Sequence, residues 1–521
     1  MALPTTIKTP GVYIDEKDAF PNSVVGVETS IPAFIGYTEK AEYDEKSIIN
    51  KPIRVDSFKE FERFFGKGHK TTYNLNEEQT PIDQPQNYDI KLQDKAYKLE
   101  ATDKSRFNLY DSIKFFYQNG GGSCFIISIG TFEDQPFESI QPFKEAIDLL
   151  EKEPEPTMIV IPDAVLFDEA DDCYNLQNYM ITHCGEQMNR VAILDIFNGA
   201  HGLNDPTYNP VDEFRDNITS NYLSYGAAYY PWLHTTIVQA REVNHTNLNK
   251  DGRELLANIC RQAISNFEST QKESLMGYID LLNEIQPLKI ETDSDDTSEV
   301  TVDENTIKNV LSIAIPEYKL VMENLLKKKN LLPPSGAIAG IYTLVDSQRG
   351  VWKAPANVAV SAVVSPAVLI DYREQEDLNA PLLGKAINAI RPFIGLGTMV
   401  WGARTLDANS LDWRYINVRR TIIMIEQSIK FAVKAYVFEP NMKNTWVSVE
   451  AMITNFLTNL WKSGALAGAA PSDAFSVNVG LGTTMTATDI LEGRMIIEAK
   501  VAVSRPAEFI VLTFQQQMQT S

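Results

Sequence analysis

The apolar residues between positions 107 and 235 fall into short continuous runs that are separated by stretches of helical period. The runs are rich in β-branched and aromatic side chains, and they occupy residues 125–129, 158–161, 191–196 and 226–230. Between the first two runs, Phe143, Ile147 and Leu150 follow the spacing of one helix face. Short apolar strands that alternate with helices are typical of a sheet with parallel pairing. The pattern therefore predicts an α/β layer in this region.

The remaining segments show other patterns. Residues 31–37 form a compact apolar run that predicts a strand, whereas residues 67–106 are polar and lack a clear period, which indicates a peripheral segment. Residues 240–330 have a mainly helical pattern, interrupted by an acidic loop at 291–296. An amphipathic helix that ends at Gly464 is also predicted, and its apolar positions are Val449, Met452, Ile453, Phe456, Leu457, Leu460 and Trp461.

Both ends of the chain carry short segments of strand-forming composition. Residues 5–14 are β-branched and aromatic around Pro10-Gly11, and residues 508–514 form a compact β run. Proline lacks the amide donor of a sheet ladder, so the first segment suits an edge strand or an extended arm. Each end can pair inside its own chain, or it can complete the sheet of a neighbouring chain by β-augmentation. The pattern alone leaves both arrangements open.

The composition is that of a globular protein with a strong negative charge. The 521 residues include 47 Lys and Arg against 69 Asp and Glu, which gives a formal net charge of −22. Such a chain is poorly suited to bind nucleic acid or anionic membranes, because both reward clustered positive charge. We expect no secretory signal and no membrane span, and we interpret the four cysteines as reduced thiols of a protein made in the cytoplasm.

Several residues could carry chemistry, and each also has a plain structural explanation. Gly120-Gly121-Gly122-Ser123 lacks the lysine and the strand–loop–helix order of a phosphate loop and suits a helix end. Residues 247–258 resemble a calcium loop but lack its final glutamate, which favours a turn before a helix. His183, Cys184 and Cys173 match no standard zinc spacing. We therefore predict no catalytic, metal or cofactor-binding residue and no cofactor.

A series of short motifs follows in a fixed order along the chain. In the C-terminal part these are Pro333-Pro334-Ser335-Gly336, Arg349-Gly350-Val351-Trp352, Val400-Trp401-Gly402-Ala403-Arg404-Thr405, Asn417-Val418-Arg419-Arg420 and Pro506-Ala507-Glu508-Phe509. Near the N-terminus they are Thr9-Pro10-Gly11-Val12-Tyr13 and Ala33-Phe34-Ile35-Gly36-Tyr37. Together these motifs resemble the contractile tail sheath family of bacteriophages and related injection systems.

The resemblance implies an α/β multidomain fold. In this fold a C-terminal mixed α/β sheath domain is completed by strands from neighbouring subunits, and further α/β domains lie at the periphery. The expected segments are an N-terminal extended arm at 1–30, a first body strand and variable peripheral segment at 31–106, an α/β peripheral domain at 107–330 with a helical acidic insertion at 236–330, a sheath core domain at 331–507, and a C-terminal strand and tail at 508–521.

The resemblance also implies a structural subunit that is not an enzyme. Subunits of this family polymerise as stacked hexameric rings around an inner tube, and the sheath contracts to drive the tube through a target envelope. The expected partners are other copies of the chain, the inner tube protein, and the baseplate and tail-terminator proteins, without direct nucleic-acid contact or membrane insertion. Assembly is expected in the bacterial cytoplasm, as part of a phage tail or a phage-tail-like particle. The alternatives are an enzyme on the α/β layer, with Asp163 and Asp195 as candidate carboxylates, and a non-contractile tube or shell protein.

Individual residues receive roles from the same resemblance. It favours pairing of both terminal segments with other subunits, and the expected pairing residues are Thr6, Ile7, Val12, Tyr13, Ile14, Phe509, Ile510, Val511, Leu512 and Phe514. Residues 422–434 resemble the inner helix of the family, so Lys430 and Lys434 are candidate tube-facing residues. The alternative for these lysines is a solvated helix face on which Glu426 supports Lys430 at the i, i+4 spacing.

Overall fold

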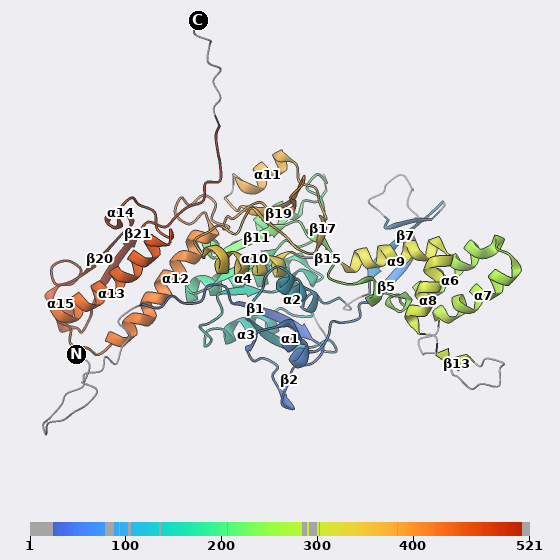
Figure 1. Cartoon of the computed structure of the whole chain (residues 1–521), viewed down its shortest axis with the longest axis horizontal. Helices are drawn as coiled ribbons and strands as arrows, with labels where there is room; N and C mark the ends of the chain where they lie inside the picture. Colours follow the sequence, from blue (N-terminus) through green and yellow to red (C-terminus); the bar gives the residue numbers. More distant parts are fainter. Residues whose placement is uncertain are drawn as a thin grey trace, which may run out of the picture. The chain divides into compact units, whose positions relative to one another are not determined.

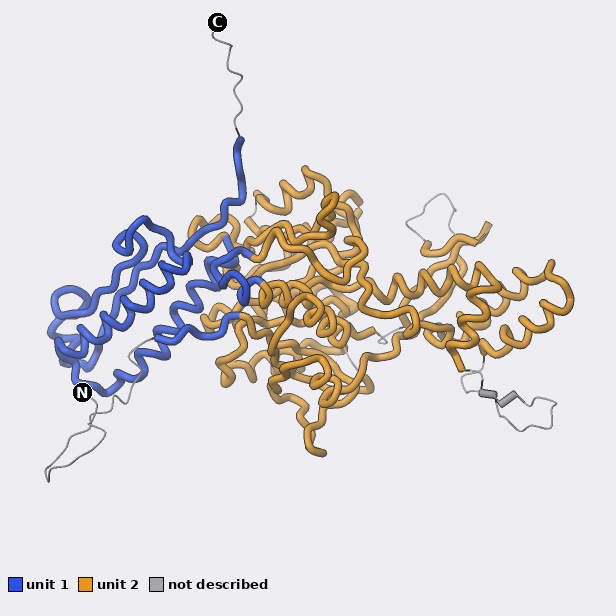
Figure 2. Tube along the Cα trace, viewed as in Figure 1, with its two compact units in different colours: residues 1–29, 345–354, 415–521 blue, residues 30–344, 355–414 orange. Residues whose placement is uncertain are grey.

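The chain folds into two compact units (Figure 2). The computed structural model describes residues 24–78, 88–92, 94–102, 106–134, 137–205, 207–283, 289–290, 300–301, 303–382 and 384–512. Unit 1 comprises residues 1–29, 345–354 and 415–521, and unit 2 comprises residues 30–344 and 355–414. The five segments expected from the sequence divide the chain in another way, and their boundaries stay predictions.

Unit 2 is built on a nine-stranded sheet in the order β16-β19-β18-β11-β10-β9-β1-β8-β4. Its strands are β1 Pro32–Thr38, β4 Ile53–Val55, β8 Cys124–Thr131, β9 Met158–Val160, β10 Val191–Asp195, β11 Gly226–Tyr230, β16 Val358–Ala359, β18 Ile387–Phe393 and β19 Gly397–Val400. The strands from β18 to β8 pair in parallel, and Ala33 of β1 lies opposite Phe125 of β8 and Ile159 of β9. Strands β4, β19 and β16 run antiparallel to their neighbours.

The sheet confirms the α/β prediction for the middle of the chain. Every residue of β1, β10 and β11 is buried, as is typical of parallel strands that are covered on both faces. The accompanying helices are α1 Phe58–Phe65, α2 Leu109–Gln118, α3 Gln141–Leu149, α4 Ala170–Gln187, α5 Pro210–Asn217, α10 Ser335–Arg349 and α11 Tyr372–Asn379. Smaller elements are the hairpin of β2 Glu42–Tyr43 and β3 Lys46–Ser47, and the antiparallel sheet of β15 Leu331–Leu332, β12 Leu233–Thr235 and β17 Val363–Pro366.

Unit 2 also contains a helical module (Figure 1), whose buried apolar side chains form one core. Its elements are β5 Tyr73–Glu78, β6 Ile90–Leu92, β7 Lys95–Ala101, α6 Lys250–Ala263, α7 Ser269–Asp280, α8 Glu304–Ala314 and α9 Pro316–Lys329, with the short hairpin of β13 Lys289–Ile290 and β14 Val300–Thr301. The helices confirm the helical pattern predicted for residues 240–330, whereas the acidic loop predicted at 291–296 lies outside the described residues. The sheet of β5, β7 and β6 was missed, because Tyr73 and Leu75 alternate with polar residues over only a few positions.

The described part of unit 1 consists mainly of two long helices and a small sheet. Its elements are α12 Ile416–Val433, the 3₁₀-helix η8 Lys434–Tyr436, α13 Lys443–Lys462, α14 Pro471–Ala474, β20 Phe475–Val479, α15 Ala487–Leu491 and β21 Ile497–Val501. Val449, Ile453 and Leu457 of α13 belong to the same apolar core as Met424 of α12. The predicted amphipathic helix is therefore confirmed, and Gly464, at φ 86°, follows its C-cap.

Two motifs considered for ligand binding have structural roles in unit 2. Helix α2 ends at Gln118, and Gly120 adopts φ 91° in the turn toward β8, a conformation that favours glycine. Asn249 caps α6, because its Oδ1 accepts the amide of Gly252 at 2.7 Å. Across the described residues, all helices are too short or too polar to traverse a lipid bilayer.

Candidate functional site

Residues 508–512 present a row of exposed apolar side chains. These side chains are 73%, 78%, 86% and 73% exposed, in the order Phe509, Ile510, Val511 and Leu512. The beginning of the segment is held by Tyr415, whose hydroxyl donates to Glu508 Oε2 at 2.9 Å. Contiguous exposed apolar residues mark interaction sites in folded proteins. The other residues predicted to pair with neighbours lie outside the described residues, and they are Thr6, Ile7, Val12, Tyr13, Ile14 and Phe514.

The sheet of β20 and β21 lies in the same unit. The two strands pair antiparallel, with Val477 opposite Ala499, and Val477 packs into the core that includes α13. Within the described residues, each of these strands has a sheet partner on one side only. A two-stranded sheet has little stability by itself, and its open edges carry backbone groups that can pair with another strand. The sheet is therefore able to accept a further strand.

The root of the N-terminal arm is held along α12. The amide of Val27 donates to Ser428 Oγ at 3.0 Å. Arg420 donates to the carbonyl of Thr29 at 2.9 Å and forms an ion pair with Asp346, in which Nη2 and Oδ2 are 2.5 Å apart and the side chains are 3% and 4% exposed. The hydroxyl of Thr29 donates to Asp346 Oδ2 at 2.6 Å. Because the carboxylate is buried and satisfied from two sides, the arm root is fixed to α12.

The sequence analysis did not find this anchor. Arg420 and Asp346 are 74 residues apart, so no local spacing links them. One sequence signal was available: an arginine occupies a position that the helix period predicts to be buried. Arg419 and Arg420 are both buried on α12, and a buried arginine requires a partner.

Lys430 and Lys434 lie at the end of α12 and the beginning of η8, and both are exposed. The Nζ atom of Lys434 is 4.7 Å from the ring centroid of Phe431. Phe431 and Phe438 are 42% and 102% exposed, so the lysines belong to a surface that is both basic and apolar. Basic side chains also interact favourably with a helix C-terminus. The tube-facing role and the solvated-face alternative both stay predictions.

The carboxylates considered for catalysis are buried caps of helices. Asp163 is fully buried, and its Oδ1 accepts the amide of Asn108, the residue before α2, at 2.6 Å. Asp195 is 3% exposed, and its Oδ1 accepts the amide of Ser335 at the beginning of α10 at 2.9 Å. Burial raises the pKa of each carboxyl group to about 7. Neither group is within reach of a substrate, and both have the cap role that the sequence analysis set against catalysis.

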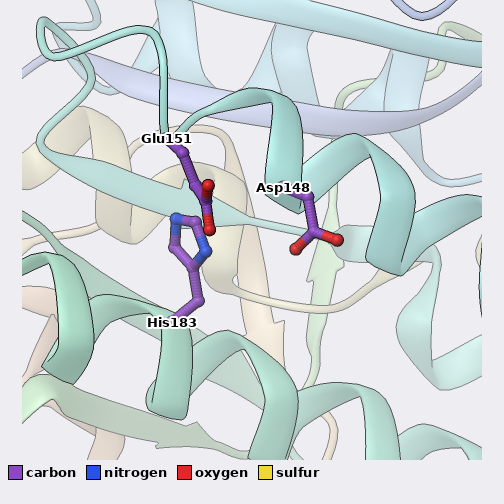
Figure 3. A group of neighbouring side chains, drawn as sticks. All are labelled: Asp148, Glu151 and His183. Carbon is purple, nitrogen blue, oxygen red and sulfur yellow. The ribbon is translucent and has the colours of Figure 1, made fainter.

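His183 lies beside two carboxylates in unit 2 (Figure 3). Asp148 of α3, Glu151 just after α3 and His183 of α4 each place one possible ligand atom within 4.8 Å of the others. His183 is 5% exposed, and its Nε2 is buried without a hydrogen-bond partner among the described residues. Burial, together with the charge of Arg190, lowers the pKa of His183 to about 4, so the imidazole is neutral. The sequence analysis weighed His183 only with nearby cysteines, because the packing of two helices and not local spacing brings the carboxylates to it.

The four cysteines are free and buried, as predicted for reduced thiols. Burial raises the pKa of Cys124, Cys184 and Cys260 to about 12. Because the thiolate is the reactive form of cysteine, these thiols are inert at neutral pH.

Comparison with protein families relates the C-terminal part of the chain to tail sheaths. Residues 408–517 match the model of the phage tail sheath C-terminal domain. The tail sheath protein of Vibrio phage KVP40 is 25% identical over 169 residues, which are 32% of this chain and 25% of that protein. The tail sheath protein of Burkholderia phage BcepMu is 27% identical over 173 residues, which are 32% of this chain and 36% of that protein. The matched parts thus span about a quarter and about a third of these two curated relatives.

Solved structures are similar over nearly the whole chain. The contracted sheath complex of the extracellular contractile injection system PVC is 25% identical with a TM-score of 0.58, and the match covers 99% of each chain. The contracted helical sheath of the anti-feeding prophage is also 25% identical with a TM-score of 0.58, and the match covers 98% of this chain and 100% of that chain. All four of these similar proteins are tail sheath proteins or proteins of a contractile sheath.

Proposed function

We propose, from the premise that this chain belongs to the contractile tail sheath family, that it is the sheath subunit of a contractile phage-tail-like particle. In this proposal copies of the chain form stacked hexameric rings around an inner tube, and they shorten and widen to drive the tube through a target envelope. The baseplate triggers the change, a tail-terminator protein closes the far end, and the particle is assembled in the bacterial cytoplasm. The observation that carries the proposal is the similarity to contracted sheaths over almost the full length of the chain.

The C-terminal segment is the proposed link to a neighbouring subunit. Its apolar side chains, Phe509 to Leu512, are exposed in one chain, and full burial of such a side chain is worth about 1.5–3 kcal/mol. The sheet of β20 and β21 has open edges within the described residues. A strand added to such an edge gains a ladder of backbone hydrogen bonds, which needs little side-chain complementarity and tolerates rotation of the connected bodies. The N-terminal arm, including residues 5–14, is proposed to act in the same way.

The end of α12 is the proposed contact with the inner tube. Lys430 and Lys434 supply positive charge on a chain whose overall charge is −22. Exposed ion pairs are individually weak, which suits a contact that must hold during assembly and release when the sheath contracts. Phe431 and Phe438 add exposed apolar surface at the same place.

Deletion of residues 508–521 tests the proposal. The full chain is produced together with its inner tube protein, and particles are examined by electron microscopy. We expect striated cylinders from the full chain and dispersed subunits or single rings from the deletion variant, because the variant lacks the strand that joins subunits. The matched control is deletion of residues 515–521, which removes only the polar tail and leaves residues 508–514 in place.

The two deletions separate strand donation from a general effect of truncation. The control variant is expected to assemble like the full chain. Normal cylinders that still shorten after deletion of residues 508–521 would contradict strand donation. Dispersed subunits from the full chain itself, with its tube protein present, would contradict the sheath function.

A further inference from the structure

Asp148, Glu151 and His183 form a cluster that the proposed sheath function does not use. The amide of Glu151 donates to the carbonyl of Asp148 at 3.1 Å, and this turn keeps the two residues at the i, i+3 spacing of neighbouring side chains. His183 projects from α4 toward both carboxylates (Figure 3). The cluster thus brings together the C-terminal end of α3 and the C-terminal part of α4.

His183 is the feature that distinguishes this cluster from an ordinary acidic patch. Its side chain is 5% exposed, and its Nε2 atom has no hydrogen-bond partner among the described residues. Buried polar atoms without a partner are uncommon in folded proteins, and they call for a functional explanation. One nitrogen of the ring lies within 4.8 Å of the carboxylate oxygens. An imidazole nitrogen in this position can offer its lone pair to a cation.

We propose that Asp148, Glu151 and His183 bind a divalent transition-metal ion of the class to which Zn²⁺ belongs. Imidazole nitrogen and carboxylate oxygen are both ligands of such ions. Bond lengths of about 2.0–2.2 Å place ligand atoms about 3–3.5 Å apart around the ion. The possible ligand atoms lie within 4.8 Å of one another, and rotation of the exposed carboxylate side chains can shorten these distances. His183 stays in place because it is buried.

The surroundings orient one ligand and set the charge of the site. The hydroxyl of Tyr179 donates to Asp148 Oδ1 at 2.5 Å, which leaves Oδ2 for the ion, and metal ligands are usually held by such outer hydrogen bonds. Arg190, which donates to the carbonyls of Leu150 and Glu153 at 2.9 and 2.8 Å, brings a positive charge nearby. The two ligand carboxylates outweigh this charge. A bound ion therefore ties α3 to α4 and stabilises unit 2.

Zinc binding by the purified, untagged full chain tests the site. After treatment with a chelator, the protein is titrated with ZnCl₂ in a calorimeter, and its thermal unfolding is recorded with and without the ion. We expect one tight equivalent per chain and a Tm that rises by about 2 °C or more. Millimolar Mg²⁺ is expected not to replace Zn²⁺, because magnesium prefers an octahedral set of oxygen ligands.

Variants assign the binding to these residues. The double variant Asp148→Asn/Glu151→Gln changes only exposed side chains and is expected to weaken zinc binding at least about tenfold. Two controls are expected to bind like the natural chain: Glu145→Gln, on an exposed position of α3, and His201→Gln, which removes another histidine whose Nε2 lies 3.4 Å from Asp205 Oδ2.

The carboxylate variant decides the outcome even if the buried variant His183→Gln fails to fold. Zinc binding by Asp148→Asn/Glu151→Gln that is as tight as in the natural chain overturns the proposal, and so does the absence of a tight equivalent in the natural chain. A selective loss in this variant, with both controls unchanged, supports it.

Discussion

Asp163 and Asp195 each accept a backbone amide before or at the beginning of a helix, although they lie near the ends of strands β9 and β10. The fit around Asp163 is close, because a Cβ atom at Gly36 would lie 2.6 Å from its Oδ2. Asp346 has a comparable anchoring role in unit 1, where it pairs with Arg420. At the scale of single residues, the buried carboxylates of this protein hold backbone and side-chain donors in place.

The cap role of Asp195 predicts a pH dependence of stability. Burial raises its pKa to about 7, whereas an unfolded chain releases the same proton near pH 4. Between these values the unfolded state binds fewer protons than the native state, so the free energy of unfolding falls as the pH rises from about 4 to about 7. The substitution Asp195→Asn removes the titration and keeps an oxygen acceptor for Ser335. We therefore expect the Tm of this variant to fall less than that of the natural chain between pH 5 and pH 8, measured by thermal unfolding.

An exposed cap provides the control for this prediction. Asp303 accepts the amide of Thr306 at 2.7 Å before α8, and its hydrogen bonds lower its pKa. Such a group is ionised in both states above pH 5, so Asp303→Asn is expected to leave the slope of Tm against pH unchanged over the same interval. Equal slopes for the natural chain and Asp195→Asn would show that Asp195 does not titrate as its burial requires.

At the scale of elements, the sequence predicts those helices and strands whose hydrophobic pattern is clear over a short stretch of chain. The strands β8, β9, β10 and β11 are recognisable because parallel strands covered on both faces are continuous apolar runs. The strands β5 and β7 are not, because polar residues interrupt their few buried apolar residues, such as Tyr97 and Leu99 of β7. Helix α13 is recognisable by its apolar period, whereas residues 422–434 of the α12 region were identified through the family resemblance. The contacts that these helices make, such as the ion pair of Arg420 with Asp346, depend on how distant segments pack together. No local sequence pattern predicts such contacts.

Helix α12 is the element for which a change of charge is most informative. The double variant Lys430→Glu/Lys434→Glu reverses two exposed charges at the end of this helix. On the proposed contact with the inner tube, we expect fewer and shorter sheathed tubes when the variant is produced with the tube protein, because attraction becomes repulsion. The yield is measured by sedimentation and electron microscopy.

A charge-matched control separates a local contact from the change in net charge. Lys319→Glu/Lys327→Glu alters two exposed lysines of α9 in the helical module, with the same change of charge. This control is expected to assemble normally. If the α12 variant forms sheathed tubes as well as the control does, Lys430 and Lys434 lie on a solvated face and not against the tube.

At the scale of the whole molecule, the chain combines segments that can link one copy to the next with folded bodies that carry the same net negative charge in every copy. The exposed residues 509–512 and the open edges of β20 and β21 supply material for links between copies. The formal charge of −22 means that facing bodies of neighbouring copies repel each other at low ionic strength. Backbone-paired links tolerate a change in spacing, whereas repulsion between the bodies favours the larger spacing. The extended state of a sheath built from this chain is therefore expected to be sensitive to salt.

The salt dependence of contraction tests this expectation directly. The Debye length is about 10 Å at 0.1 M salt and about 3 Å at 1 M, so high salt removes repulsion across gaps between bodies. We expect assembled particles to contract at a lower temperature or a lower denaturant concentration in 1 M NaCl than in 0.05 M NaCl, with the contracted fraction counted in micrographs. A neutral osmolyte at matched osmolality controls for effects of water activity and is expected not to lower the threshold. Salt screens only interactions between charges. If the threshold is the same from low to molar salt, the surplus of acidic residues does not set the spacing of the bodies. Short-range contacts alone would then hold the extended state.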